Sequence, residues 1–348
     1  MASLETSRLL INDYLQAFLQ DKRQSAASLH PNYERLLGEI ERVTLAGGKR
    51  LRPHLVFVGY GKQDSSIAPL AAGYELLHTA LLVHDDIIDR DIVRHGQATI
   101  HQAYFEKHYT NLSSTTERHH FSTSAAILAG DILISWAYEL LASMDMPADK
   151  YRQSSTIMSE AIFNVAGGEL IDTESPFSTH AIDPIVVANY KTASYSFVGP
   201  LLAGAILSDH HYSDESLSKL KEYATNIGIA FQIRDDILGV FGDEAKTGKS
   251  TIGDLREGKR TVLIDFFIKS ASSDEQTLFD RYFGNPGSTD EALTKLKELL
   301  RTSHAYTQTI ELEKTYLERA TAALEDLKSE HLYADLHELR NRIQGRGA

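Results

Sequence analysis

Four carboxylates stand close together in the stretch Leu81–Asp91, which reads LLVHDDIIDRD. At about 100° per residue on a helix, Asp85 and Asp89 lie roughly 40° apart on one face, and four residues rise about 6 Å. Leucine and isoleucine surround them, as in a buried helix, where ionised carboxylates rarely lack a partner. Neighbouring carboxylates repel each other, and oxygen ligands select a hard cation. The stretch predicts a Mg²⁺ site, with a solvated acidic face as the alternative.

A second acidic stretch, FQIRDDILGVFGD, begins at Phe231 and repeats the pattern of the first. Each aspartate pair follows an apolar run and a residue that can be cationic, His84 in one case and Arg234 in the other. We expect two acidic helices that face each other and hold several Mg²⁺ ions, with diphosphate oxygens completing the octahedra. The repeat is incomplete, because Gly239 stands four residues after Asp235 in place of an acid. A capped or salt-bridged helix end is the alternative for this stretch alone.

Clustered basic residues interrupt a chain whose formal net charge of −13 disfavours nucleic-acid binding. In GGKRLRP, Lys49, Arg50 and Arg52 follow two glycines, which allow the backbone to approach a ligand closely. These side chains can donate to phosphate oxygens, although a solvated basic face is the ordinary alternative. Further candidates for anion contacts are Arg94, Lys191, Thr192, Lys249 and Lys259. Together they predict two anion sites, one bridged by metal and one purely basic.

Apolar residues recur at helical spacing along the whole chain, so the predicted fold class is all-α. We expect helices within 4–45, 53–60, 67–90, 124–144, 150–173, 184–208 (kinked at Gly199-Pro200), 213–241, 259–270, 273–283, 288–302 and 304–343. Loops are expected at 110–123 and 243–258. No domain boundary is evident, so we predict a single domain over residues 1–348.

The composition limits compartment and environment. The 348 residues include no cysteine, which excludes disulfides and thiolate metal sites and fits a reducing cytoplasm. No run of 18 uncharged apolar residues occurs, so no membrane span is expected.

The set of motifs resembles the trans-isoprenyl diphosphate synthases, or polyprenyl synthases. GGKRLRP, ELLHTALLVHDDIID, RHG, YKTAS, FQIRDDILGVFGD and GDLREGKRT follow one another between about residues 40 and 265. The resemblance implies a single all-α bundle of the isoprenoid-synthase type around a central cavity, usually as a homodimer. It also implies an enzyme that condenses isopentenyl diphosphate with an allylic diphosphate (C5–C15). The linear trans product is expected to be C20 geranylgeranyl diphosphate.

Matched motif by motif, the resemblance implies roles for individual residues. The Mg²⁺ ligands, for three ions bound with the allylic diphosphate, are expected to be Asp85, Asp89 and Asp235, supported by Asp86 and Asp236. The expected contacts of the allylic diphosphate are Arg94, His95, Lys191, Thr192, Gln232, Lys249 and Lys259. Those of the isopentenyl diphosphate pocket are Lys49, Arg52 and His78. The carbonyl oxygens of Lys191 and Thr192, with the Gln232 amide, are expected to steady an allylic cation.

Three departures from the family pattern concern how tightly the site binds its ligands. RHG replaces Arg-Arg-Gly, and His95 is a weaker, pH-dependent anion donor. Glu169, in GGELID, stands where glutamine is usual. Gly239 replaces the third acid of the second motif. None of these changes removes an expected first-line Mg²⁺ ligand.

The helix before Asp85 is expected to set product length. Ala80 and Leu81 lie five and four residues before Asp85, where an aromatic residue in this family blocks growth near C15. Leu77 and Tyr74, three and six residues before Ala80, lie along the same face of the helix. We expect Tyr74, with Phe163 from a later helix, to close the cavity, which favours C20. The alternative is that Tyr74 and Phe163 are ordinary core residues.

Other functions agree less well with the sequence than this one. Within the class, the alternative is a longer-chain synthase (C25–C40). A class I terpene cyclase is disfavoured because it needs neither GGKRLRP nor His78. A catalytically silent regulatory subunit is disfavoured because the aspartates and lysines are all kept. Histidine pairs at 119–120 and 210–211 lack the ligand spacing of a zinc site.

Overall fold

The computed structural model describes residues 3–178, 182–242 and 251–345. The chain divides into two compact units, Met1–Thr156 with Ala203–His210, and Ile157–Leu202 with His211–Ala348. Helices α7 and α9 contribute residues to both units. The prediction of a single domain therefore stays a prediction, and each unit is described by itself.

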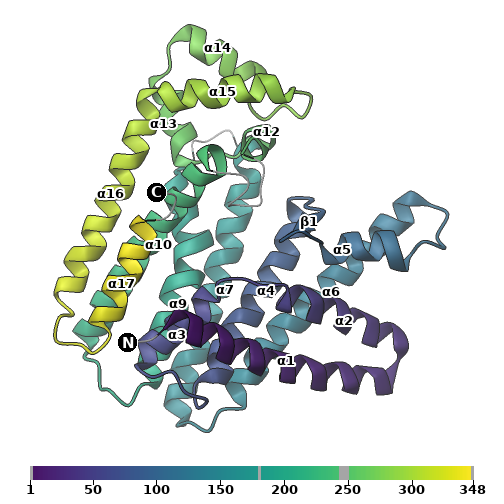
Figure 1. Ribbon diagram of the computed structural model, residues 1–348, viewed down its shortest axis with the longest axis vertical. Coiled ribbons are helices and arrows are strands. Elements are labelled where there is room, and N and C mark those ends of the chain that lie inside the picture. The colour runs from purple at the N-terminus through teal and green to yellow at the C-terminus, as the bar shows by residue number, and fades with distance from the viewer. Residues whose placement is uncertain (1–2, 179–181, 243–250, 346–348) are drawn as a thin grey trace. The chain divides into compact units, whose positions relative to one another are not determined.

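The first unit is built of helices around α4 and α6, which pack side by side (Figure 1). Its elements are α1 (Leu4–Leu29), α2 (Pro31–Leu45), α3 (Leu51–Tyr60), α4 (Ala68–Ile88), β1 (Val93–Arg94), β2 (Gln97–Ala98), α5 (Ile100–Ala103), the π-helical turn η1 (Tyr104–His108), α6 (Thr115–Ala142) and the start of α7 (Ala148–Glu174). Helix α4 is buried on almost every side, which fits its nearly continuous apolar sequence.

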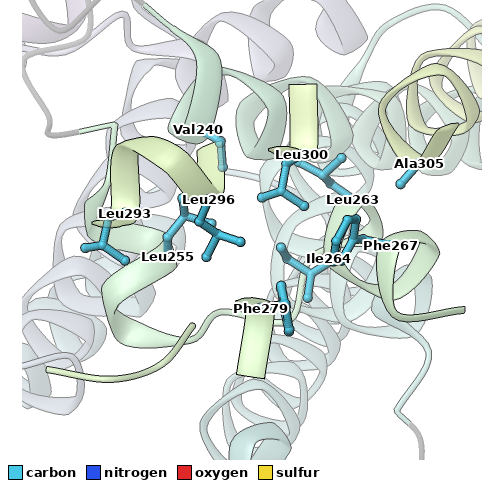
Figure 2. Close-up of a cluster of buried hydrophobic side chains, with 10 residues drawn as sticks. All are labelled: Val240, Leu255, Leu263, Ile264, Phe267, Phe279, Leu293, Leu296, Leu300 and Ala305. Atoms are coloured by element: carbon cyan, nitrogen blue, oxygen red, sulfur yellow. The ribbon is translucent and has the colours of Figure 1, made fainter. Parts of the chain in front are cut away.

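The second unit packs around α10, which contacts η3 and α16. Its elements are the rest of α7, η2 (Ser175–Phe177), α8 (Pro184–Val187), the π-helical η3 (Ala188–Val198), α9 (Gly199–Leu207, shared), α10 (Asp214–Phe241), α12 (Gly253–Glu257), α13 (Val262–Ser270), α14 (Ser273–Tyr282), α15 (Asp290–Thr302), α16 (His304–Glu325) and α17 (Tyr333–Gln344). Figure 2 shows one of its apolar clusters, to which α10 and α12–α16 all contribute side chains. Burial of this cluster fixes the C-terminal helices.

The predicted all-α class is confirmed, and the differences are local. Helix α6 begins at Thr115, inside the segment predicted as a loop, because the Ser114 hydroxyl accepts from the Glu117 amide and caps it. The stretch expected as one kinked helix over 184–208 is interrupted by η3, before Gly199. Residues 304–343 form two helices, and 93–98 form a short antiparallel hairpin.

By length and apolar composition, one helix among the described residues, α6, could cross a membrane. Half of its most apolar window is buried within the protein. Core helices of soluble proteins pass the same test, so α6 is weak evidence for a span and the expectation of none stays a prediction.

Phe267 tests the role of the cluster in Figure 2. Its side chain is 1% exposed and its ring lies 5.2 Å from that of Phe279, centroid to centroid. Phe267→Ala should lower the free energy of unfolding by about 3–5 kcal/mol, because it removes buried area and leaves a cavity. Urea unfolding measures this loss. Phe177→Ala is the control, since Phe177 is 86% exposed, and equal losses in the two variants would contradict the account.

Candidate functional site

The first acidic cluster lies at the C-terminal end of α4. Asp85 and Asp86 are in its last turns, and Asp89 is the residue that caps the helix. The carbonyl groups at this end carry partial negative charge, which adds to the repulsion among the carboxylates. The structure thus brings the three aspartates to one helix end, where a cation is needed.

Arg94 supplies positive charge to this cluster from β1. Its Nη2 lies 3.1 Å from Asp85 Oδ2 and 3.2 Å from Asp91 Oδ2, and its Nε donates to Asp86 Oδ1. The hairpin that returns Arg94 to α4 turns at His95 and Gly96, both with positive φ. Arg94, expected as a diphosphate contact, is therefore held by carboxylates, and an anion would have to compete with them for its donors.

Asp86 is the most buried carboxylate of the cluster, at 4% exposure. Its pKa is raised to about 7, chiefly because burial disfavours the charged form, while Arg94 lowers it and Asp85 and Asp91 raise it further. Burial, more than the neighbouring carboxylates, therefore favours the protonated form of Asp86.

The second acidic pair lies in the last two turns of α10, where a chain of hydrogen bonds fixes Asp236. The Thr192 hydroxyl donates to Gln232 Oε1 at 2.5 Å, and Gln232 Nε2 donates to Asp236 Oδ1 at 2.7 Å. Burial raises the pKa of Asp236 well above its usual range. The hydrogen bond from Gln232 lowers this pKa, and the charge of Asp254 raises it further. The structure therefore connects Thr192, Gln232 and Asp236, which the sequence analysis placed in one site.

Asp254 is a carboxylate of this region that the sequence analysis missed. It lies on α12, and its Oδ2 occupies the space that a Cβ at position 239 would need. Gly239 stands where the motif lacks its third acid, and it therefore faces an acid supplied by α12. The only signal in the sequence was the acid in GDLREGKRT. Asp243, the last acid of FQIRDDILGVFGD and a more distant candidate to replace this third acid, lies outside the described residues.

Lys191 is held between two carboxylates of α7. Its Nζ lies 2.9 Å from Glu169 Oε2 and 2.6 Å from Asp172 Oδ2. Gly168 makes this possible, because a Cβ there would overlap the backbone of Lys191. Glu169, which stands where the family usually has glutamine, thus forms an ion pair with Lys191. Lys259 pairs with neighbouring acids, 3.2 Å from Glu257, and Lys249 lies outside the described residues.

The GGKRLRP loop separates its three cations. Gly47 and Gly48 adopt positive φ values of 124° and 118°, and Arg50 adopts 51° at the start of α3. Lys49 is exposed and Arg52 partly buried, whereas Arg50 points inward. The expectation that all three side chains donate to phosphate is therefore wrong for Arg50.

Arg50 instead joins this loop to three helices of the first unit. Its Nη1 lies 2.6 Å from Glu75 Oε1 on α4, its Nε donates to Asn12 on α1, and its Nη2 donates to the Thr44 carbonyl on α2. The side chains of Arg50 and Glu75 are 3% and 5% exposed. This buried pair fixes the loop from which Lys49 and Arg52 project.

His78 marks a region of positive charge beside this loop. The imidazole is buried on α4, and its pKa lies well below the usual range, first because of burial and then because of Arg52, Arg94, Arg50 and His95. It is therefore neutral near pH 7. The GGKRLRP loop and the β1–β2 hairpin thus both bring positive charge toward His78.

The residues expected to set product length differ in burial. Tyr74, Leu77 and Ala80 are fully buried on α4. Within the described part of the chain, the Tyr74 hydroxyl has no hydrogen-bond partner, and burial raises its pKa. Phe163 is 80% exposed, which does not favour its expected place at the floor of an internal cavity.

The donor set fits a hard divalent cation, because carboxylate oxygens predominate. Among residues 3–178, 182–242 and 251–345, no group of three or more His, Asp or Glu side chains is arranged to hold a metal ion alone. Oxygens from a ligand are therefore needed to complete the coordination of an ion at either pair.

Comparison with known proteins decides the family. The sequence model described as "Polyprenyl synthetase" matches residues 34–300. The chain belongs to this family. Geranylgeranyl diphosphate synthase of Saccharolobus solfataricus is 33% identical over 290 residues, which cover 81% of each chain. Geranylfarnesyl diphosphate synthase of Aeropyrum pernix is 31% identical, with 90% of this chain and 91% of the relative covered.

A solved structure extends the likeness to nearly the whole chain. Geranylgeranyl pyrophosphate synthase of Corynebacterium glutamicum, crystallised with isoprenyl diphosphate and magnesium, has a TM-score of 0.91. It is 29% identical, and 99% of each chain is covered. The resemblance inferred from the motifs is confirmed, and this polyprenyl synthetase is a trans-prenyltransferase.

Arg50→Met tests the buried pair of the first unit. It should lower the free energy of unfolding by about 3–5 kcal/mol, because Glu75 is left as a buried charge without its partner. Adding Glu75→Leu removes that charge and should recover most of the loss. Urea unfolding of the single and double variants measures both effects. A double variant no more stable than the single one would contradict this role.

Proposed function

We propose that this polyprenyl synthetase is a Mg²⁺-dependent geranylgeranyl diphosphate synthase, which condenses isopentenyl diphosphate with an allylic diphosphate. The observation that carries the proposal is the presence of two carboxylate clusters, on α4 and α10, together with two cations, Arg94 and Lys191, that are bound to acids. Such clusters suit a ligand that brings both divalent cations and phosphate oxygens. A homodimer, three Mg²⁺ ions and a cytoplasmic location belong to the same proposal.

The acids and cations of the chain prepare the allylic diphosphate for departure. Asp85, Asp89 and Asp235 supply carboxylate oxygens to the metal ions. Bound Mg²⁺ would neutralise the negative charge that develops on the leaving oxygen. Arg94 and Lys191 exchange their carboxylate partners for diphosphate oxygens, so that their charge is added where the leaving group forms.

Isopentenyl diphosphate binds in the basic region of the first unit. Lys49 and Arg52 donate to its phosphate oxygens, and neutral His78 adds a hydrogen bond. The Thr192–Gln232–Asp236 chain holds the amide oxygen of Gln232 in a fixed place, where its lone pair stabilises the allylic cation. No side chain in this region is an evident base, so the proton lost after carbon–carbon bond formation goes to the departing diphosphate.

Product analysis tests the proposal directly. The protein is incubated with labelled isopentenyl diphosphate and each primer (C5, C10, C15), with Mg²⁺ or with a chelator. We expect C20 product from each primer accepted and none with the chelator. Products of C25–C40 would instead support the longer-chain alternative. That alternative is the second candidate, because one relative is named geranylfarnesyl diphosphate synthase. No elongation of any primer would overturn the proposal.

Asp85→Ala and Asp235→Ala test the two acidic clusters separately. Each should lower kcat by about 10²–10³-fold or more, because a group that stabilises the transition state through the metal is lost. Steady-state kinetics measure kcat, and circular dichroism verifies the fold. Asp149→Ala, at an exposed position of α7, should leave kcat unchanged. A full rate in either cluster variant would exclude that cluster from the chemistry.

Ala80→Phe tests whether α4 sets product length. The larger side chain should stop growth earlier and shift the main product from C20 to C15. Because Ala80 is fully buried, overpacking should lower the free energy of unfolding by about 1–3 kcal/mol. Tyr74→Ala is the converse test, and longer products are expected from it. Chromatography of the dephosphorylated products measures length. Unchanged lengths in both folded variants would show that this stripe does not limit growth.

A further inference from the structure

A residue that can be cationic stands directly before each aspartate pair, and a cation so placed can compete with a metal ion. Arg94 shows that the carboxylates of this protein attract a guanidinium, since it contacts Asp85, Asp86 and Asp91. Arg234 adjoins Asp235 in the chain and carries the same group. Where its side chain points therefore bears on whether the acids of α10 accept a divalent cation.

Arg234 is turned toward α16 by a two-pronged ion pair. Its Nε donates to Glu313 Oε1 at 2.8 Å, and its Nη2 lies 2.7 Å from Glu313 Oε2. Two parallel bonds fix the orientation of a guanidinium as well as its position. The fork is thus a specific attachment of Arg234 to α16.

The surroundings of the pair make this attachment hard to exchange. Glu313 is 1% exposed. Ile233 and Ile237 of α10 belong to an apolar cluster against which Ile310 and Tyr316 of α16 pack. A buried carboxylate in such surroundings requires a counter-charge, so Glu313 retains Arg234 strongly.

His84, which precedes the first aspartate pair, is also directed to a neighbouring helix. Its Nε2 lies 3.4 Å from the Ile127 carbonyl on α6, and its ring fills the space beside Gly130 that a Cβ would occupy. Both residues that precede an aspartate pair thus bind a neighbouring helix.

We propose that Glu313 is a positioning residue, which binds the Arg234 guanidinium and keeps it from competing with divalent cations for Asp235 and Asp236. The inference rests on the proposed function, because it takes these acids as the metal-binding side chains. Glu313 lies beyond residues 34–300, the part of the chain that the family model matches.

Direct metal binding tests this role without relying on turnover. Mn²⁺ replaces Mg²⁺, inorganic diphosphate is the anion, and free Mn²⁺ is measured by electron paramagnetic resonance. Glu313→Gln should weaken Mn²⁺ binding about tenfold, as expected for a competing charge worth one pKa unit. Glu313→Gln with Arg234→Gln should bind within about twofold of the unmodified protein, because the competitor is gone.

Two controls separate positioning from loss of charge and from loss of fold. Glu311→Gln removes the same charge from an exposed position of α16 and should leave Mn²⁺ binding unchanged in 0.5 M KCl, where the Debye length is about 4 Å. Thermal unfolding shows which variants are folded. Glu313→Asp keeps the charge but shortens the side chain, so it should weaken binding in the same direction by a smaller factor.

Three results would overturn the inference: unchanged Mn²⁺ affinity in folded Glu313→Gln or Glu313→Asp, a double variant as weak as the single one, or equal weakening by Glu311→Gln. The failure of this inference differs from that of the proposed function. If isopentenyl diphosphate is condensed but the Mn²⁺ pattern is absent, only the positioning role fails. If the Mn²⁺ pattern is present but no condensation occurs, only the proposed function fails.

Discussion

The mutual repulsion of clustered carboxylates is the constraint on which the rest of this structure depends. Asp85, Asp86 and Asp89 gather at the end of one helix, and Asp235 and Asp236 stand near the end of another. Burial makes the repulsion more costly, since water is not there to screen it. The pKa of Asp86 is raised to about 7, chiefly by burial, and the charges of Asp85 and Asp91 raise it further while Arg94 lowers it. A protein that keeps such clusters needs cations supplied from elsewhere.

The cations of the chain divide into two groups according to their partners. Arg50 and Arg234 are bound by single buried glutamates, Glu75 and Glu313. Arg94 and Lys191 are bound by acids that belong to the candidate site itself. The first group builds the scaffold, and the second can change partners when an anion arrives. The division is made by tertiary contacts, because all four residues have the same charge.

The sequence predicted those features that local pattern determines. The apolar runs and the acids of α4 and α10 lie on one helix each, so their spacing alone places the carboxylates. The family motifs supplied the expected activity class, which the comparisons confirm. The start of α6 was missed, although Ser114 and Glu117 provide a local capping signal.

Other features depend on contacts between segments far apart in the chain, which no single-sequence pattern reveals. The inward turn of Arg50 depends on Glu75, and the fork of Arg234 depends on Glu313, 79 positions away. Asp254 opposite Gly239 and the exposure of Phe163 are of the same kind. In each case the sequence shows which residue is present, but it does not show which distant residue contacts it or how far it is buried.

Calorimetry with an unreactive allylic thiolodiphosphate tests the central claim most directly, namely that the carboxylate clusters require a ligand carrying both metal ions and phosphate oxygens. The analogue is titrated into the protein with Mg²⁺ and, separately, with a chelator. The account predicts saturable binding with Mg²⁺ and a loss of most of the affinity without it, because the acids would then repel the diphosphate. Equal affinity in both titrations would contradict the account.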